Sequence, residues 1–151
     1  MKTLIVVAQR DGARLYEWTT RAEPLRLIEE LAHPEGRLRE GDLDTDRSGA
    51  SYESSASGAS SAAAGSVSAT AHLAVVFAHR VADRTDHALA DHAFDRLVLV
   101  SGPRFLGLLR DELSNSTRAL KRHEIVKNLG HASARELKAH IEPELLFAAH
   151  A

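Results

Sequence analysis

Residues 94–113 read FDRLVLVSGPRFLGLLRDEL and predict a strand, a tight turn and a helix in direct succession. Residues 97–100 are an uninterrupted apolar run of strand length, which favours a strand covered on both faces at the centre of a sheet. Ser101 and Gly102 form the predicted turn. Pro103 takes the first helical position, where its fixed φ is favourable and its missing N–H costs nothing. The segment is therefore half of an α/β unit.

The helix after this turn is predicted from apolar residues at helical spacing, which leaves charged residues for solvent. Arg104 lies in its first turn, beside the backbone N–H groups that a helix leaves without partners at its start. An anion is therefore one candidate ligand, although most turns of this kind bind nothing. The apolar residues are Phe105, Leu106, Leu109 and Leu113.

The composition suits one globular domain over residues 1–151. Hydrophobic residues make up 44% of the chain and charged residues 26%, and the formal net charge at pH 7 is -2. This balance gives no overall attraction to nucleic acid or anionic membrane, so binding of either requires a local patch. Cysteine is absent, which excludes disulfides, thiolate nucleophiles and cysteine-ligated metals and fits a reducing cytoplasm.

Apolar runs are too short for export or membrane insertion. The N-terminal run covers residues 4–8, which is too short for the apolar region of a signal peptide. No other run reaches the length that crosses a bilayer. We therefore expect a cytoplasmic protein without a membrane partner.

Three short strands are predicted at residues 3–8, 13–18 and 25–31. Consecutive short strands joined by short loops usually pair as antiparallel neighbours, so these three predict a meander at one side of the sheet. The exposed edge of such a meander can pair with a second copy, so both a monomer and a homodimer fit.

The second half of the chain predicts helices that alternate with strands. A long helix covers residues 72–89, a short turn or helix covers residues 114–120, and a fifth strand includes residues 124–126. The resulting plan is α/β: a ribonuclease-H-like five-stranded mixed sheet, made of a three-stranded antiparallel meander and two α/β units. A ferredoxin-like arrangement fits less well, because it needs a helix after the first strand.

A last helix is predicted from a capping box. Ser133 and Glu136 have the spacing of reciprocal caps, and Leu137 and Ile141 face inward. Pro143 is expected to end or kink this helix.

Residues 48–71 are a low-complexity segment with 9 serines, 8 alanines and 3 glycines in 24 positions. Large apolar groups are too few to offset the entropy of ordering this segment. We therefore predict a long flexible loop within the single domain, and we expect it to serve function or to be a plain connection.

No catalytic constellation is evident. A two-metal nuclease needs carboxylates on its central strands, but residues 3–8 contain none. The histidines are scattered, and neither a nucleophile elbow nor a phosphate-binding glycine loop is present. We predict a protein that is not an enzyme and that holds no metal or cofactor. His33 and His131 each lie beside a turn, where a histidine can cap backbone groups, or act as a general base if a pocket forms.

Basic residues outnumber acidic ones in the C-terminal third. Residues 103–140 hold eight lysines or arginines against four acids, whereas residues 35–53 hold three arginines against six acids. A basic face of this size can follow the phosphates of a nucleic acid, although mixed charge on a solvated surface is the simpler alternative. The candidate nucleic-acid contacts are Arg104, Arg110, Arg118, Lys121, Arg122 and Lys127. A second candidate group, at the base of the predicted loop, is His33, Arg37, Arg39, Arg47 and Tyr52.

Three segments together resemble the bacterial host attachment proteins, described as required for attachment to host cells. These segments are HPEGRLREGDLDTDR (residues 33–47) with Gly49 and Tyr52 after it, the 94–113 segment, and VKNLGHASAREL (residues 126–137). The resemblance covers nearly the whole chain and implies a ribonuclease-H-like fold. That family is in turn similar to the middle domain of archaeal and eukaryotic release factors, and is grouped with bacterial release-factor-like proteins.

Release factors of that kind use a Gly-Gly-Gln tripeptide whose glutamine positions the water that hydrolyses peptidyl-tRNA. This chain has no Gly-Gly pair, and its single glutamine is Gln9, at the end of the first predicted strand. The resemblance therefore implies a non-catalytic binding domain of release-factor-like ancestry, with RNA or the ribosome as the expected partner. The alternative is a protein-interaction or regulatory factor that affects host attachment indirectly, through the acidic segment 35–53 and the loop.

Overall fold

The chain folds into five strands and four helices over the residues that the computed structural model describes, which are 2–34, 59–120 and 122–150. The strands are β1 (Thr3–Gln9), β2 (Gly12–Trp18), β3 (Arg26–Ala32), β4 (Arg96–Ser101) and β5 (Arg122–Val126). The helices are α2 (Ala59–Asp91), α3 (Pro103–Glu112), α4 (Asn115–Ala119) and α5 (Ala134–His150). The predicted order of elements is confirmed.

The strands form one mixed sheet in the order β3-β2-β1-β4-β5. β1 pairs antiparallel with β2 and parallel with β4, while β3 and β5 extend the two sides. The predicted five-stranded mixed sheet is confirmed, but its predicted centre is wrong. β1 occupies the centre, and β4 lies beside it. Both strands have a neighbour on each side and are buried on both faces, so their apolar runs do not distinguish the two positions.

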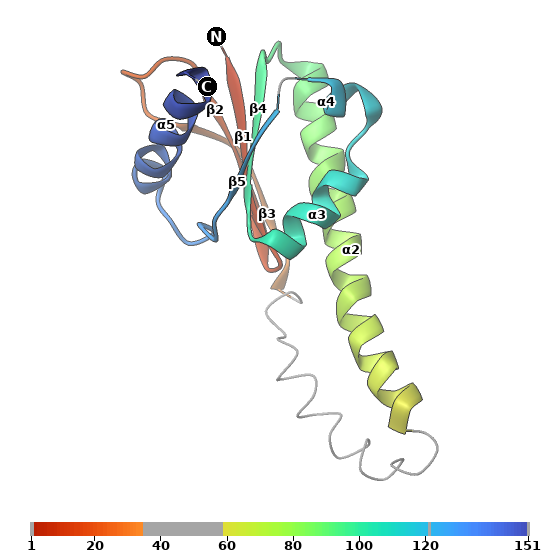
Figure 1. Cartoon of the computed structure of the whole chain (residues 1–151). Helices are drawn as coiled ribbons and strands as arrows, with labels where there is room; N and C mark the ends of the chain where they lie inside the picture. Colours follow the sequence, from red (N-terminus) through yellow and green to blue (C-terminus); the bar gives the residue numbers. More distant parts are fainter. Residues whose placement is uncertain (1, 35–58, 121, 151) are drawn as a thin grey trace.

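Helices cover both faces of the sheet (Figure 1). Alternate side chains of β1 enter two separate cores, because successive strand residues point to opposite faces. Leu4 and Val6 pack with residues of α2 and α3 in one core, and Ile5 and Val7 pack with residues of α5 in the other. The molecule therefore has three layers, with α2 and α3 on one side and α5 on the other.

Helix α5 begins with the predicted capping box. The Glu136 N–H donates to Ser133 Oγ at 3.1 Å, and the Ser133 N–H donates to Glu136 Oε1 at 3.2 Å. Of the two outcomes expected at Pro143, an end or a kink of this helix, an end is wrong, because α5 continues to His150. Leu145 lies two helical turns beyond Leu137 and is buried in the same core, so packing of the apolar stripe offsets the hydrogen bond that proline removes.

Helix α2 begins earlier than predicted. Residues 59–71 of the expected flexible loop belong to this helix, and residues 48–58 lie outside the described residues. Alanine has the highest intrinsic helix propensity, so an alanine-rich segment can extend a helix without an apolar stripe of its own. Thr70 and Ala74 are already buried, which shows that packing begins before residue 77.

The different burial of two leucines predicts different losses of folding stability for the same substitution to alanine. Leu99 is fully buried on β4, so Leu99→Ala should lower the free energy of unfolding by about 2–5 kcal/mol. Leu27 is 47% exposed on β3, so Leu27→Ala should change it by less than about 0.5 kcal/mol. Urea denaturation followed by circular dichroism measures both, and equal losses would contradict this placement.

Candidate functional site

A pocket of about 630 Å³ lies where the parallel strands β1, β4 and β5 end. The carboxyl ends of parallel strands meet at one edge of a sheet, and ligands of open α/β sheets commonly bind outside that edge. Gln9 ends β1 and Arg10 follows it, Ser101 ends β4, and Asn128 comes two residues after β5. Residues of α2, of α3 and of the N-cap before α3 supply the remaining wall: Thr70, Ala71, Ala74, Val75, Gly102, Pro103, Arg104, Phe105 and Leu108.

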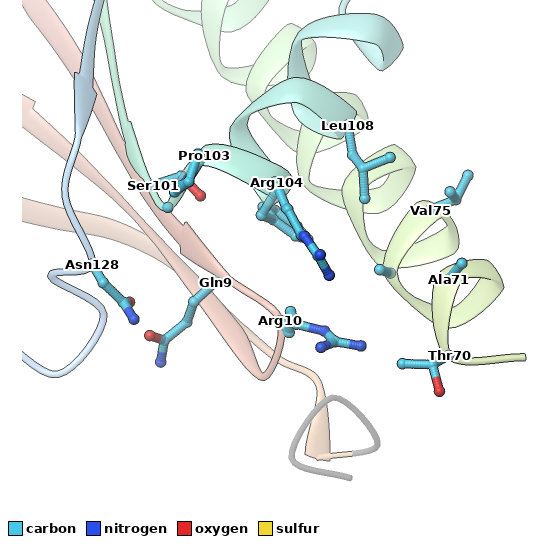
Figure 2. A pocket seen from close by; sticks show the side chains of 13 residues that line it. Gln9, Arg10, Thr70, Ala71, Val75, Ser101, Pro103, Arg104, Leu108 and Asn128 are labelled. Carbon is cyan, nitrogen blue, oxygen red and sulfur yellow. The ribbon is translucent and has the colours of Figure 1, made fainter. Parts of the chain in front are cut away.

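Two arginines extend into this pocket from different elements. Figure 2 shows the side chain of Arg104 descending from the start of α3, and that of Arg10 reaching outward from the end of β1. The described lining residues include both cations and no aspartate or glutamate. An anion placed between the two guanidinium groups would be attracted to both.

The first turn of α3 faces the same space. Gly102 is the N-cap, has extended backbone angles and provides no side-chain cap, and Pro103 follows it. A Cβ built on Gly102 meets no atom within 4 Å, so the backbone at the start of the helix is open. The positive end of the helix dipole therefore adds to the charge of the two arginines.

Ser101 places a buried hydroxyl on the wall of the pocket. The residue is 1% exposed, and its Oγ has no hydrogen-bond partner among the described residues. Ser101 shares the strand face of Leu97 and Leu99, whose side chains point toward α2 and α3, where the pocket lies. A buried hydroxyl without a partner is costly, which indicates that a group absent from the protein itself can satisfy it.

The hairpin that presents Arg10 is held by His33. His33 Nδ1–H donates to the Arg10 carbonyl oxygen at 2.7 Å, and the His33 backbone N–H donates to the Asp11 carbonyl at 3.0 Å. The imidazole also stacks on Phe77 of α2, with ring centroids 4.4 Å apart. The structure thus gives His33 the backbone-capping role, one of the two predicted from the sequence.

The loop after β5 is fixed against the sheet by Arg14. Its guanidinium donates to the carbonyl oxygens of Leu129 and Gly130, at 3.4 and 2.9 Å, and to Tyr16 Oη at 2.8 Å. Burial raises the pKa of Tyr16 despite this cation. Gln9 lies directly against Gly130, where an added Cβ would be 1.9 Å from Gln9 Cδ. His131, the second predicted histidine, has its Nε2 3.5 Å from Gln9 Nε2.

Most of the predicted nucleic-acid contacts are engaged within the protein. Arg110 forms two hydrogen bonds with the Glu124 carboxylate, both at 3.0 Å, and Arg122 lies 3.3 Å from the same group. Arg118 donates to the Asp111 carbonyl, and Lys127 pairs with Glu144 at 3.4 Å. Arg104 alone of the described candidates lines the pocket. Lys121 lies outside the described residues, as do Arg37, Arg39, Arg47, Tyr52 and the whole acidic segment 35–53.

Sequence reasoning missed Arg10, Arg14 and Ser101 as site residues. The signal for Ser101 was its place at the end of an apolar strand, and that for Arg10 was its place directly after one. Both become informative once those strands are known to be parallel neighbours. Arg14 gave no signal, because its partners are 115 and 116 residues away in the sequence. Within the described residues, no three His, Asp or Glu side chains are grouped to hold a metal ion. No helix in that part of the chain is both long and apolar enough to cross a membrane.

Comparisons with known proteins gave one family and a distant structural neighbour. The family described as "Protein required for attachment to host cells" matches residues 4–141. A solved structure described as "Archaeal protein" is similar over 99% of this chain and 40% of that chain, with 13% sequence identity and a TM-score of 0.38. The chain therefore spans less than half the length of that neighbour. Curated proteins gave no match.

The ion pair at Glu124 predicts a specific effect of acid. The hydrogen bonds from Arg110 lower the pKa of Glu124 below its usual value of 4.5. Protonation therefore favours the unfolded chain. The stabilisation is complete above pH 4.5 and is lost as the pH falls through the lower folded-state pKa.

Glu124→Gln keeps the shape of the side chain and removes this titration. The variant should be less stable than the parent at pH 7, and the difference should be smaller at about pH 3, because protonation of Glu124 weakens the pair as the pH falls. Urea midpoints at both pH values measure the effect. A difference that stays constant or grows on acidification would contradict the assigned pair.

Proposed function

This chain belongs to the family of proteins required for attachment to host cells, and we propose that it is a non-catalytic, cytoplasmic domain that binds RNA or the ribosome. The family description names a cellular outcome and no chemical activity. The proposal therefore has to be supported by the surface of the domain itself.

We also assign a ribonuclease-H-like fold and a release-factor-like ancestry within this proposal. The strand order β3-β2-β1-β4-β5, a meander followed by two parallel additions, supports the fold. The ancestry is supported by the resemblance of residues 33–47, 94–113 and 126–137 to the host attachment proteins, which are in turn similar to the middle domain of release factors. Because the Gly-Gly-Gln tripeptide is missing, the expected role is binding without hydrolysis.

The observation that supports RNA as the partner is the convergence of Arg10 and Arg104 at the carboxyl edge of the sheet. A guanidinium group can donate two parallel hydrogen bonds to two oxygens of one phosphate. The start of α3 adds positive potential in the same place. Arg110, Arg122 and Lys127 pair with carboxylates and do not line this pocket, so we place the phosphate contact at Arg10 and Arg104.

A double substitution tests this proposal. Arg10→Ala with Arg104→Ala should reduce retention of single-stranded RNA and co-sedimentation with ribosomes. It should also make the negative slope of log affinity against log salt concentration less steep by roughly 1 to 1.5, because each lost phosphate contact on a single strand contributes about 0.7 to the steepness.

The matched control removes the same charge from the opposite end of the sheet. Arg21 and Arg26 have side chains that are 66% and 67% exposed, and Arg21→Ala with Arg26→Ala should leave binding nearly unchanged. Equal losses of RNA binding in the two double variants would show that RNA is attracted by overall positive charge and not by a defined site. A parent protein that stays in the supernatant at low salt would overturn the RNA proposal and favour a protein partner.

A further inference from the structure

The pocket at the carboxyl edge combines a cationic mouth with an apolar wall. Arg10 and Arg104 lie at one end, whereas Ala71 and Val75 of α2 face Leu108 of α3 at the other. Its volume of about 630 Å³ is within the range of pockets that bury small organic ligands. A ligand that fits both ends has a compact anionic group joined to an apolar or ring-shaped body.

Ser101 provides an independent indication of the anion's position. Its hydroxyl is buried, has no partner among the described residues and lies on the pocket wall directly before Gly102. A hydroxyl in this place can donate a hydrogen bond to a ligand oxygen. The same oxygen can accept hydrogen bonds from the open N–H groups in the first turn of α3. A single acceptor group would thus satisfy the buried hydroxyl and lie between the two arginines.

We propose that this pocket binds a phosphate monoester, with its phosphate between Arg10, Arg104, Ser101 and the start of α3 and its organic part against α2 and α3. A monoester carries a charge of about -1.5 to -2 at pH 7 and three acceptor oxygens, which matches two guanidinium groups, a hydroxyl and a helix start. An internal RNA phosphate has one charge and two free oxygens, so it fits this donor set less well.

The monoester has two possible sources, a free nucleotide-like molecule or the 5′-phosphorylated end of an RNA. The second source rests on the proposed function and names the group on RNA that the pocket would take. Four probes distinguish these sources: adenosine 5′-monophosphate, adenosine, and one short oligoribonucleotide with either a 5′-phosphate or a 5′-hydroxyl. Affinities are measured by calorimetry with the full chain.

The phosphate should raise affinity at least tenfold in one or both probe pairs. An effect with the mononucleotide indicates a free small molecule, and an effect limited to the oligonucleotides indicates an RNA end. If the phosphate changes affinity less than twofold in both pairs, the inference is overturned. Equal binding of the oligoribonucleotides with a 5′-phosphate and a 5′-hydroxyl would support RNA binding and contradict a site for the terminal phosphate. A phosphate effect in the mononucleotide pair without any RNA binding would support the monoester site and contradict RNA binding.

Two variants test the proposed hydrogen-bond donors and are expected to keep the protein folded. Ser101→Ala removes a buried hydroxyl that has no protein partner, so it should leave the melting temperature unchanged or higher while weakening phosphate binding about tenfold. Gly102→Asp places a carboxylate at an extended N-cap with open space around its Cβ. It should stabilise α3 as a helix cap and abolish phosphate binding by repulsion.

Arg26→Gln is the matched control for Arg104→Gln, because Arg26 is an exposed arginine at the other end of the sheet. Only the Arg104 variant should weaken binding of the phosphorylated probe. Full phosphate binding by Ser101→Ala and Gly102→Asp would contradict the proposed position of the phosphate.

Discussion

The central constraint of this fold is that β1 must pair on both sides and be apolar on both faces. It hydrogen-bonds to β2 on one side and to β4 on the other, and its alternate side chains enter the two cores. A shift by one residue would exchange those side chains between the faces and place Ile5 and Val7 in the core that now holds Leu4 and Val6. The register that prevents this shift also determines where the strand ends.

The pocket is a consequence of that register. Pairing of Val7 with Val100 brings the end of β1 next to the end of β4, so Gln9 and Arg10 meet Ser101 where both apolar runs stop. Polar side chains collect at this edge, where the pocket lies between the strand ends and the walls formed by α2 and α3. The support of Arg10 by His33 and of the 129–130 loop by Arg14 shows that the edge is built from contacts between distant parts of the chain.

Local signals in the sequence were sufficient for most elements and insufficient for their arrangement. The 97–100 run, Pro103 and the Ser133–Glu136 box each act within a few residues, and each gave a correct element. The choice of β1 over β4 as the centre depends on which strands become neighbours, which burial pattern does not reveal. Charge counts likewise identified a basic third of the chain. They could not show that Arg110 and Arg122 share Glu124, because that pairing exists only after β5 lies beside α3.

The contact between Gln9 and Gly130 limits how these two positions can vary through evolution. A Cβ at residue 130 would occupy the space of the Gln9 amide, so a larger residue there requires a shorter or displaced side chain at residue 9. Substitutions at the two positions should therefore be correlated among descendants of the same ancestor. The only glutamine of the chain thus shares its space with a glycine 121 residues later, and a side chain at residue 130 fits only if the end of the Gln9 side chain moves.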